Sequence, residues 1–447
     1  MNPKSVRTVA VIVIIFTTGF IVGQLVMSVQ VRSAAEARRL DLIEGTVREG
    51  EHLRQIEQLQ ALGYVDGTID ENAELRGVET HDRDRAWPGV NFYSSRIRAS
   101  ARLIDNDGRE LHVWSHLGDD GWEHAELLPN GDLLVVVNQQ SIFRLDRNSE
   151  LLWRVELEAH HDLAVHPSGE IYALTNEVRL RPEIHPDVPV IEDFIQILTS
   201  DGQPTERISL LDALRSSDFA FLLASPQHLP SDRRTGERPR LDMLHTNHIE
   251  VFDGSLAHRS PIFGKGNALV SMRTINTIAI IDPRTRKVLW AWGPTNLHRQ
   301  HHPTLLDNGN ILLFDNGRRR SQIVELDPSS YEVVWRYAPR GGFLSRYRGS
   351  AQRLPNGNTL IVESDYGRAF EVRPDSTIVW EFTNPHRAGK KERLVATLFD
   401  VVRIEPEQTA GWPVSYTHLT LPTTCTPCRS RWSPAEEKGG GGGGGGG

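Results

Sequence analysis

Short apolar runs separated by polar turns recur along the chain from residue 101 onward. One repeated unit is an apolar run, a turn that contains Asp, and a second run that ends in Trp. Its copies occupy residues 103–114, 143–153, 280–290, 324–335 and 370–380, and a sixth copy at 195–202 lacks the Trp. Because such runs between Gly, Asn and Asp are typical of β-strands, each copy predicts a hairpin.

A second unit joins a turn to the apolar run that follows it. It occurs at residues 128–134, 166–172, 306–312 and 354–360, each time with a Gly in the turn, and in a weaker form at 266–269. Trp290, Trp335 and Trp380 follow one another at intervals of 45 residues, which is within the length range of one four-stranded propeller blade. Six copies predict an all-β fold, a six-bladed β-propeller, with each Trp packed between blades.

The same pattern indicates which segments close the ring and where the chain contains an insertion. We expect closure to involve the lead-in at residues 78–100 or the segment at 398–404. The long gap between Trp153 and Trp290 holds one further blade and an insertion at 209–240, which is rich in Arg, Ser and Pro.

The N-terminal pattern differs from the repeats. Residues 9–29 form an uncharged apolar run of the length that a membrane-spanning helix needs, and Lys4 and Arg7 before it favour a cytoplasmic N-terminus. Residues 30–62 carry apolar positions at three- to four-residue spacing, which predicts a helical stalk. The prediction is a transmembrane helix (1–30), a stalk (31–75) and a propeller (76–412) on the periplasmic side of the inner membrane; a cleaved signal peptide is the alternative.

The C-terminal segment 413–447 has a different character. Residues 414–423 and 428–434 resemble a translated sequencing adapter, and nine consecutive Gly follow at 439–447. We therefore interpret the segment as non-native, the competing interpretation being a natural Gly-rich tail. The two cysteines, Cys425 and Cys428, both lie in it, so we expect neither a disulfide nor thiol chemistry in the propeller.

Composition excludes one class of partner. The chain has 447 residues, 38% of them apolar, and a formal net charge of −8 without a sustained Lys/Arg stripe, which argues against nucleic-acid binding. Candidate chemistry lies at four places near expected inner strands, where the sequence reads His160-His161-Asp162, Asp242-Met-Leu-His245-Thr-Asn247, Ser271-Met-Arg273 and Gln300-His301. Imidazoles titrate near neutral pH and can act as nucleophiles.

Each of these residues also has a structural interpretation. Arg273 could be a surface cation, and His161 or His245 a hydrogen-bonded side chain at a blade edge. Taken together, three His and one Arg at comparable blade positions predict a site at the mouth of the channel. Whether His160 or His161 faces that site stays open.

Together with Leu313-Phe314-Asp315-Asn316-Gly317, these motifs resemble the bacterial PAPS-independent arylsulfotransferase (arylsulfate sulfotransferase) family over residues 78–406. The resemblance implies a six-bladed propeller that transfers a sulfuryl group from a phenolic sulfate ester to a phenol. It implies that His301 becomes sulfated, that His161, His245 and Arg273 assist, and that no cofactor or metal is needed. Substrate contacts are expected from Asn247, His160 and His302.

The resemblance has departures, among them the absence of a disulfide that some members contain, and two other functions stay open. His302 stands where we expect an acidic residue that would orient His301. The expected partners are an aryl sulfate donor, a phenolic acceptor and the membrane, with the oligomeric state open. A non-enzymatic membrane-tethered scaffold or ligand-binding protein is the first alternative. A metal-dependent lactonase or hydrolase is the second, but it would need a ring of Glu, Asp and Asn in the channel.

Overall fold

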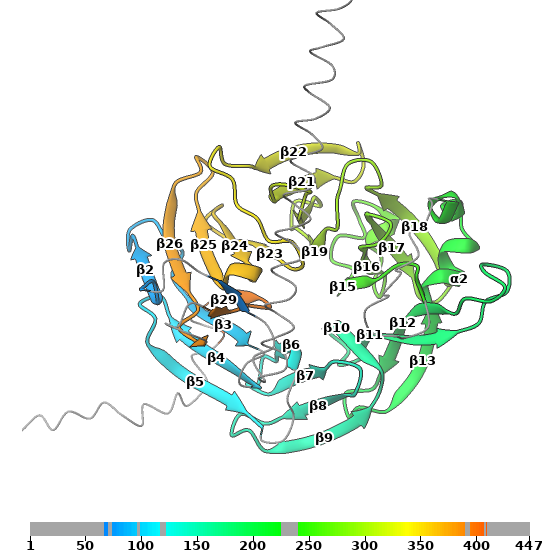
Figure 1. Cartoon of the computed structure of the whole chain (residues 1–447), viewed down its shortest axis with the longest axis horizontal. Coiled ribbons are helices and arrows are strands. Elements are labelled where there is room, and N and C mark those ends of the chain that lie inside the picture. The colour runs from blue at the N-terminus through cyan, green and yellow to red at the C-terminus, as the bar shows by residue number, and fades with distance from the viewer. Residues whose placement is uncertain are drawn as a thin grey trace, which may run out of the picture.

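Six β-sheets stand around a central channel in the computed structural model (Figure 1), which describes residues 67–69, 74–95, 99–116, 122–224, 240–388, 394–405 and 408. Each sheet contains four antiparallel blade strands, the first of which lies at the channel, and two of the sheets contain a fifth strand. The predicted six-bladed β-propeller is confirmed.

Blades 1 to 3 come from the first half of the described chain. Blade 1 contains β29 (Val401–Ile404), β3 (Val90–Ser95), β4 (Ser100–Asp105) and β5 (Glu110–Ser115). Blade 2 contains β6 (Trp122–Leu127), β7 (Leu133–Val137), β8 (Ser141–Leu145) and β9 (Leu151–Glu156). Blade 3 contains β10 (Ala159–Val165), β11 (Ile171–Arg179), β12 (Val190–Leu198) and β13 (Pro204–Ser209), with β14 (Leu241–Asp242) paired to β12.

Blades 4 to 6 complete the ring. Blade 4 contains β15 (Thr246–Val251), β16 (Ala268–Met272), β17 (Thr277–Asp282) and β18 (Lys287–Trp292); blade 5 contains β19 (His301–Leu305), β20 (Ile311–Asp315), β21 (Gln322–Asp327) and β22 (Glu332–Tyr337). Blade 6 contains β23 (Ser350–Arg353), β24 (Thr359–Glu363), β25 (Arg368–Val372) and β26 (Ile378–Thr383), with β2 (Gly77–His81) added outside. A small sheet joins β1 (Gly67–Ile69), β28 (Leu394–Ala396) and β27 (Arg387–Ala388), and 3₁₀ helices lie at η3 (Pro261–Phe263) and η4 (Ser364–Tyr366).

Both predicted closing segments take part in the closure. The C-terminal β29 is the inner strand of blade 1, where Val401 pairs with Tyr93, and β2 of the lead-in pairs with β26 of blade 6. Arg403 on β29 is fully buried and donates to Asn91 Oδ1 at 2.5 Å and to Glu371 Oε2 at 3.0 Å. This buried ion pair therefore joins blades 1 and 6.

Trp side chains of the outer strands connect neighbouring blades. The indole Nε1 of Trp114, Trp290 and Trp380 donates to a carbonyl oxygen in a turn of the next blade, at 3.1, 3.0 and 2.9 Å. Trp153 packs against Gly202, where a Cβ atom would lie 2.6 Å from the indole ring. The prediction that the Trp series packs between blades is confirmed.

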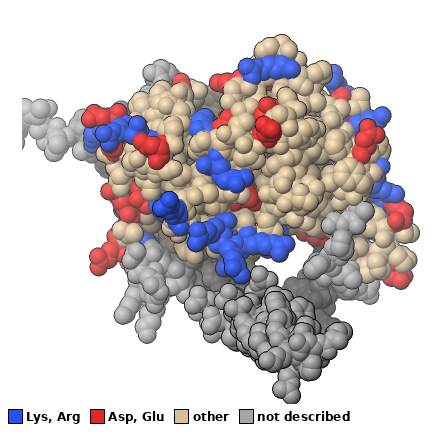
Figure 2. Space-filling model, turned by 90° about the horizontal axis from the view of Figure 1, so that it is seen from above, with Lys and Arg blue, Asp and Glu red and all other residues tan. Residues whose placement is uncertain are grey.

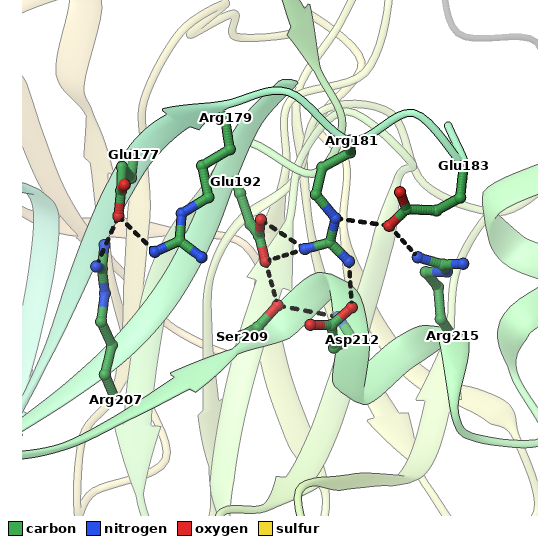
Figure 3. A network of polar contacts seen from close by, with 9 residues as sticks. All are labelled: Glu177, Arg179, Arg181, Glu183, Glu192, Arg207, Ser209, Asp212 and Arg215. Carbon is green, nitrogen blue, oxygen red and sulfur yellow. Dashed lines mark hydrogen bonds and ion pairs between the residues drawn. The ribbon is translucent and has the colours of Figure 1, made fainter. Parts of the chain in front are cut away.

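Blade 3 carries an insertion on the side where the inner strands begin. Between β13 and β15 the chain forms α2 (Leu210–Arg215) and the 3₁₀ helix η2 (Ala220–Ala224), as expected for an insertion there. Arg181 of the β11–β12 hairpin donates to both oxygens of the buried Glu192 at 2.8 and 2.7 Å and to Asp212 of α2 at 2.5 Å (Figure 3). Ser209 caps α2 by accepting from Asp212 N. The network fixes α2 against the outer strands of blade 3, at the periphery of the ring (Figure 1).

Three predictions concern residues outside the described ones: the transmembrane helix at 9–29, the stalk at 30–62 and the non-native tail at 413–447. Within the part of the chain that the structure describes, no helix has both the length and the apolar character needed to cross a bilayer.

Candidate functional site

The inner strands begin at one face of the ring, and we call this end of the channel the mouth. Two consecutive residues from each of the six blades line a single pocket there: Glu123-His124, His161-Asp162, Asn247-His248, His301-His302, Gly349-Ser350 and Phe399-Asp400, together with Arg348. The pocket has a volume of about 60 Å³. Since one water needs roughly 10–15 Å³ of such space, the pocket has room for a small group of a few atoms but not for an arene as well.

Register shifts explain why consecutive residues share this pocket. The pairing of β6 shifts between Trp122 and His124, that of β15 between Thr246 and His248, and that of β19 between His301 and Thr304. β10 shifts in the same way between Ala159 and Leu163. A bulge re-aims side chains that would otherwise alternate between the faces of a strand.

His301 is the most constrained side chain of the pocket. It begins β19 and is 8% exposed, and its Nδ1 lies 2.7 Å from Asn316 Oδ1. Asn316 Nδ2 donates to the carbonyl oxygens of Ser345 at 2.8 Å and Arg348 at 2.9 Å. Because both N–H groups of the amide are used in this way, its oxygen must face His301 and accept from Nδ1.

This arrangement selects one form of the imidazole. With the proton on Nδ1, the lone pair of a neutral ring lies on Nε2. Burial and the nearby Arg273 guanidinium hold the pKa of His301 well below its usual range, so the ring is neutral at physiological pH. His301 therefore presents a nucleophilic nitrogen to the pocket.

Arg273 supplies positive charge beside His301. It follows β16 in the turn to β17, and its backbone N donates to His245 O at 3.3 Å. Burial and the proximity of Arg299 lower the pKa of Arg273 to about 10, so it stays charged. Within the described chain, no hydrogen bond or ion pair joins its guanidinium to a protein group. Such a cation is suited to binding an anionic ligand.

His161 and His245 form a pair next to these two residues. Their Nε2 atoms are 3.2 Å apart, while His161 Nδ1 lies 3.2 Å from Glu123 Oε1 and His245 Nδ1 lies 2.5 Å from Asp242 Oδ2. Burial opposes ionisation of both carboxyls, but His161 holds the pKa of Glu123 well below its usual range and His245 lowers the pKa of Asp242. Both carboxylates are therefore ionised and accept from Nδ1.

The short contact between the two Nε2 atoms requires a proton. With each Nδ1 donating to a carboxylate, two neutral rings would set two lone pairs against each other at 3.2 Å. One additional proton shared by the pair removes this repulsion, and Glu123 and Asp242 balance its charge. The pair can thus release one proton and take it back.

The structure separates His160 from His161. The His160 side chain is buried beside Asp193, with Nε2 3.8 Å from Oδ1, and burial together with the His161 charge lowers its pKa to about 3. It does not line the pocket, whereas His161 does. The His161 imidazole, placed by a backbone φ of +59°, is thus the one that faces the site.

His302 belongs to a second layer of the pocket and does not orient His301. Its Nε2 lies 3.4 Å from Asp400 Oδ2, and its ring centroid is 4.5 Å from that of His248. His248 Nδ1 lies 2.6 Å from Asp162 Oδ2, and Asp162 Oδ1 lies 3.3 Å from His124 Nε2. The layer joins five of the six blades through three imidazoles and two carboxylates, and His302 and Asp400 also line a cleft of about 740 Å³ below it.

Charge within the second layer is balanced. Burial alone would lower the pKa of His124, but Asp162 and Glu126 raise it to about 9. Burial opposes ionisation of Asp400, but His302 lowers the pKa of that carboxyl to about 2. In the described part of the chain, no three or more His, Cys, Asp or Glu are arranged to hold a metal ion.

Of three further residues in the sequence motifs, one lines the pocket and two position strand β19. Asn247 lines the pocket, its Nδ2 donates to Gln300 O at 3.0 Å, and its buried Oδ1 has no partner in the described structure. Gln300 is fully buried and donates to Ser271 Oγ at 3.0 Å and Thr277 O at 2.9 Å. Ser271 and Gln300 therefore fix the start of β19 and hence the backbone of His301.

Sequence reasoning missed the roles of Glu123, His124, His248, Asn316 and Asp400. A signal for the first two was present. Glu123, His161, His301 and Gly349 each lie five residues before the start of a repeated turn, at Leu128, His166, Leu306 and Leu354. Extending that register to every blade would have brought Glu123 and His124 into the site.

Comparisons with known proteins place this chain in a family. Among solved structures it is similar to a Bacteroides caccae protein of unknown function (14% identity, 70% of this chain and 98% of that chain, TM-score 0.46). It is also similar to a streptogramin B lyase (14% identity, 76% and 97%, TM-score 0.42) and a Staphylococcus aureus virginiamycin B lyase (11%, 75% and 98%, TM-score 0.42). No curated protein sequence matches it. A sequence profile described as "Arylsulfotransferase (ASST)" matches residues 124–385, more than half of the 447 residues, and the chain therefore belongs to the arylsulfotransferase family.

Proposed function

We propose that this arylsulfotransferase moves a sulfuryl group from a phenolic sulfate ester to a phenol through a sulfated His301, without PAPS. The observation that carries the proposal is the bond between His301 Nδ1 and Asn316 Oδ1, which leaves Nε2 as a lone pair in a pocket with room for a small group. Group transfer through a side chain divides one displacement into two easier steps.

In the first step the Nε2 lone pair attacks sulfur, an N–S bond forms, and the S–O bond to the arene breaks. Positive charge grows on the ring, and the Nδ1–H bond to Asn316 stabilises it. Arg273 lies beside His301 and balances the charge on the sulfuryl oxygens. The departing phenolate takes the proton that His161 and His245 share.

The second step reverses the roles. The oxygen of the acceptor phenol attacks sulfur, the N–S bond breaks, and the acceptor proton returns to the His161–His245 pair. Glu123 and Asp242 hold the two rings in place during both steps. The pair thus serves as acid and then as base, and the enzyme returns to its starting state.

Mass spectrometry of the protein after a short pulse of 4-nitrophenyl sulfate tests the proposal. A sulfuryl adduct on the peptide that contains His301, lost when a phenol is added, is the expected result. An enzyme that releases nitrophenol from this donor and never carries the adduct would instead transfer the group directly between substrates.

We also infer that residues 9–29 anchor the enzyme in the inner membrane with the propeller on the periplasmic side. The inference rests on the uncharged run and on Lys4 and Arg7 before it. A chain that lacks residues 1–30 is expected in the soluble fraction, and the full chain in the membrane fraction. Recovery of the full chain in the soluble fraction, shortened at its N-terminus, would favour a cleaved signal peptide.

A further inference from the structure

The mouth face of blades 4 to 6 is strongly basic. Four of the connections that meet the mouth there, at residues 273–276, 293–300, 316–321 and 338–349, together contain eight Arg and neither Asp nor Glu, whereas the β24–β25 turn contains Asp365. Two of the eight, Arg273 and Arg348, lie at or beside the pocket. The other six are exposed, and we call them the arginine rim: Arg299, Arg318, Arg319, Arg320, Arg340 and Arg346.

The opposite face of the same three blades is nearly balanced. Its turns and the strand ends beside them carry seven basic residues, Arg259, Lys265, Arg284, Arg286, Lys287, Arg353 and Arg373, and six acidic ones, Asp253, Asp282, Asp307, Asp327, Glu332 and Asp375. The whole chain has a net charge of −8, so the positive charge of the rim is opposite in sign to the net charge of the protein. In the side view of Figure 2, basic side chains gather along one edge of the molecule with few acidic ones among them.

Four of the six rim side chains are not used to stabilise the fold by ion pairs. Arg299, Arg318, Arg319 and Arg340 form no ion pair with any carboxylate in the described part of the chain. Asp365, the acidic residue at the next mouth-side turn, is 8% exposed and accepts from the backbone N of Arg346 and Tyr347. Unbalanced like charges repel one another, which favours a surface whose counter-charge comes from a ligand.

The rim is continuous with the group that holds the nucleophile. Arg318, Arg319 and Arg320 directly follow Asn316 and Gly317 in the β20–β21 turn. Gly317 has a φ of +62°, and a Cβ there would clash with Arg320 O, so the turn needs glycine. Two to four residues of chain span at most roughly 7–14 Å, so the Cα atoms of these Arg lie within about 14 Å of Asn316.

The charges of the rim also reach the site. Burial, Arg299 and Arg318 lower the pKa of His298, which precedes the Gln300-His301 pair, and Arg299 contributes to the lowered pKa of Arg273. Because the pocket has room for a small group but not for an arene, the arene of a bound substrate must extend outward from it. Substituents of that arene therefore meet the rim.

We propose that the arginine rim binds a second anionic group of the substrate, so that the enzyme prefers arenes that carry a sulfonate, sulfate, carboxylate or phosphate in addition to the reacting oxygen. This proposal rests on the proposed sulfuryl transfer and adds its substrate class. Arg presents planar donor pairs that match such oxyanions.

A matched pair of variants tests the rim. The triple variant Arg318→Gln, Arg319→Gln, Arg320→Gln removes three charges at the mouth. The control Arg284→Gln, Arg286→Gln, Arg373→Gln removes three charges from the opposite face, where they pair with Asp282, Glu206 and Asp375. Both variants retain Asn316, Gly317 and all the pocket residues.

Transfer is measured from 4-nitrophenyl sulfate to a naphthol and to the same naphthol bearing two sulfonates. We expect wild type and control to show a KM for the disulfonate roughly tenfold or more below that of the rim variant, since several exposed charge pairs act together. The difference should shrink as salt is raised. Transfer to the uncharged naphthol should be equal in all three proteins.

Binding of the fluorescent phenol hydroxypyrenetrisulfonate, followed by anisotropy, gives a readout that does not need transfer. Weaker binding by the rim variant alone supports the rim even if no sulfuryl transfer occurs, in which case only the proposed function fails. Equal binding by all three proteins, or an equal loss in rim variant and control, would overturn the proposal. Loss of binding to phosphatidylglycerol vesicles but not to the dye would also overturn it and assign the surface to a membrane.

Discussion

Replacement of Asn316 by Ala tests how the fold prepares the nucleophile. The amide of Asn316 is fully buried and forms three hydrogen bonds: it accepts from His301 Nδ1 at 2.7 Å and donates to Ser345 O at 2.8 Å and Arg348 O at 2.9 Å. In the variant, His301 loses the acceptor that keeps the proton on Nδ1. The other tautomer, with the proton on Nε2, has no lone pair toward sulfur.

The magnitudes follow from these bonds. Each contributes roughly 0.5–1.5 kcal/mol net, and Ser345 O keeps Ser321 Oγ as a donor at 3.2 Å, so the free energy of unfolding should fall by about 2–4 kcal/mol. Loss of the correct tautomer in other catalytic histidines costs up to about 10⁴-fold in kcat. We expect kcat to fall by about 10²–10⁴-fold while KM changes little.

Nitrophenol release from 4-nitrophenyl sulfate, with a phenol as acceptor, gives kcat, and thermal unfolding gives the stability. Asn358→Ala is the matched control because Asn358 is 4% exposed and donates to Arg85 O at 2.9 Å and Glu371 Oε1 at 2.6 Å, away from the mouth. It should lose similar stability and keep its kcat. If folded Asn316→Ala retained kcat within twofold of wild type, Asn316 would not control the tautomer of His301.

Four further outcomes are expected. His301→Ala should abolish both transfer and the sulfuryl adduct in a protein that still folds and unfolds cooperatively, and an adduct on another residue would contradict the assigned nucleophile. Arg273→Lys should still bind sulfate but lose about 10²-fold in kcat, because an ammonium cannot hold two oxygens in one plane; full activity would exclude that role. The pKa of His124 is raised from about 6.5 in the unfolded chain to about 9 in the fold. Its contribution to stability is therefore complete below pH 6.5 and lost as the pH rises to 9, so the stability of His124→Gln, measured by urea unfolding, should depend less on pH over that interval. Gly202→Ala should lower the free energy of unfolding by about 1–3 kcal/mol, because φ is +83° there and the new methyl would meet Trp153; an unchanged denaturation midpoint would show that the ring moves aside.

The number of blades could be predicted from the sequence because each blade repeats the same local chemistry. Asp- and Gly-containing turns fix the hairpins, and a Trp near the end of the outer strand makes the same contact in blades 1, 4 and 6. The motif residues His161, His245, His301 and Arg273 were also named from the sequence, since imidazole and guanidinium groups at comparable blade positions are informative by themselves. The structure brings these four side chains together at the mouth.

Tertiary structure decided how those residues act. Strand alternation cannot tell whether His160 or His161 faces the channel, because a bulge between Ala159 and Leu163 breaks the alternation. No local pattern indicates that Asn316, fifteen residues after His301, would replace the acidic residue expected at position 302.

Local sequence patterns likewise do not predict the second layer of the pocket. His124, Asp162, His248 and Asp400 come from four blades and are up to 276 residues apart in sequence. Turn and strand preferences depend on residues that are close together in the chain, and local sequence patterns can therefore predict them. The protonation and orientation of a side chain depend on its neighbours in space, and only closure of the ring by β29 and β2 brings those neighbours into contact.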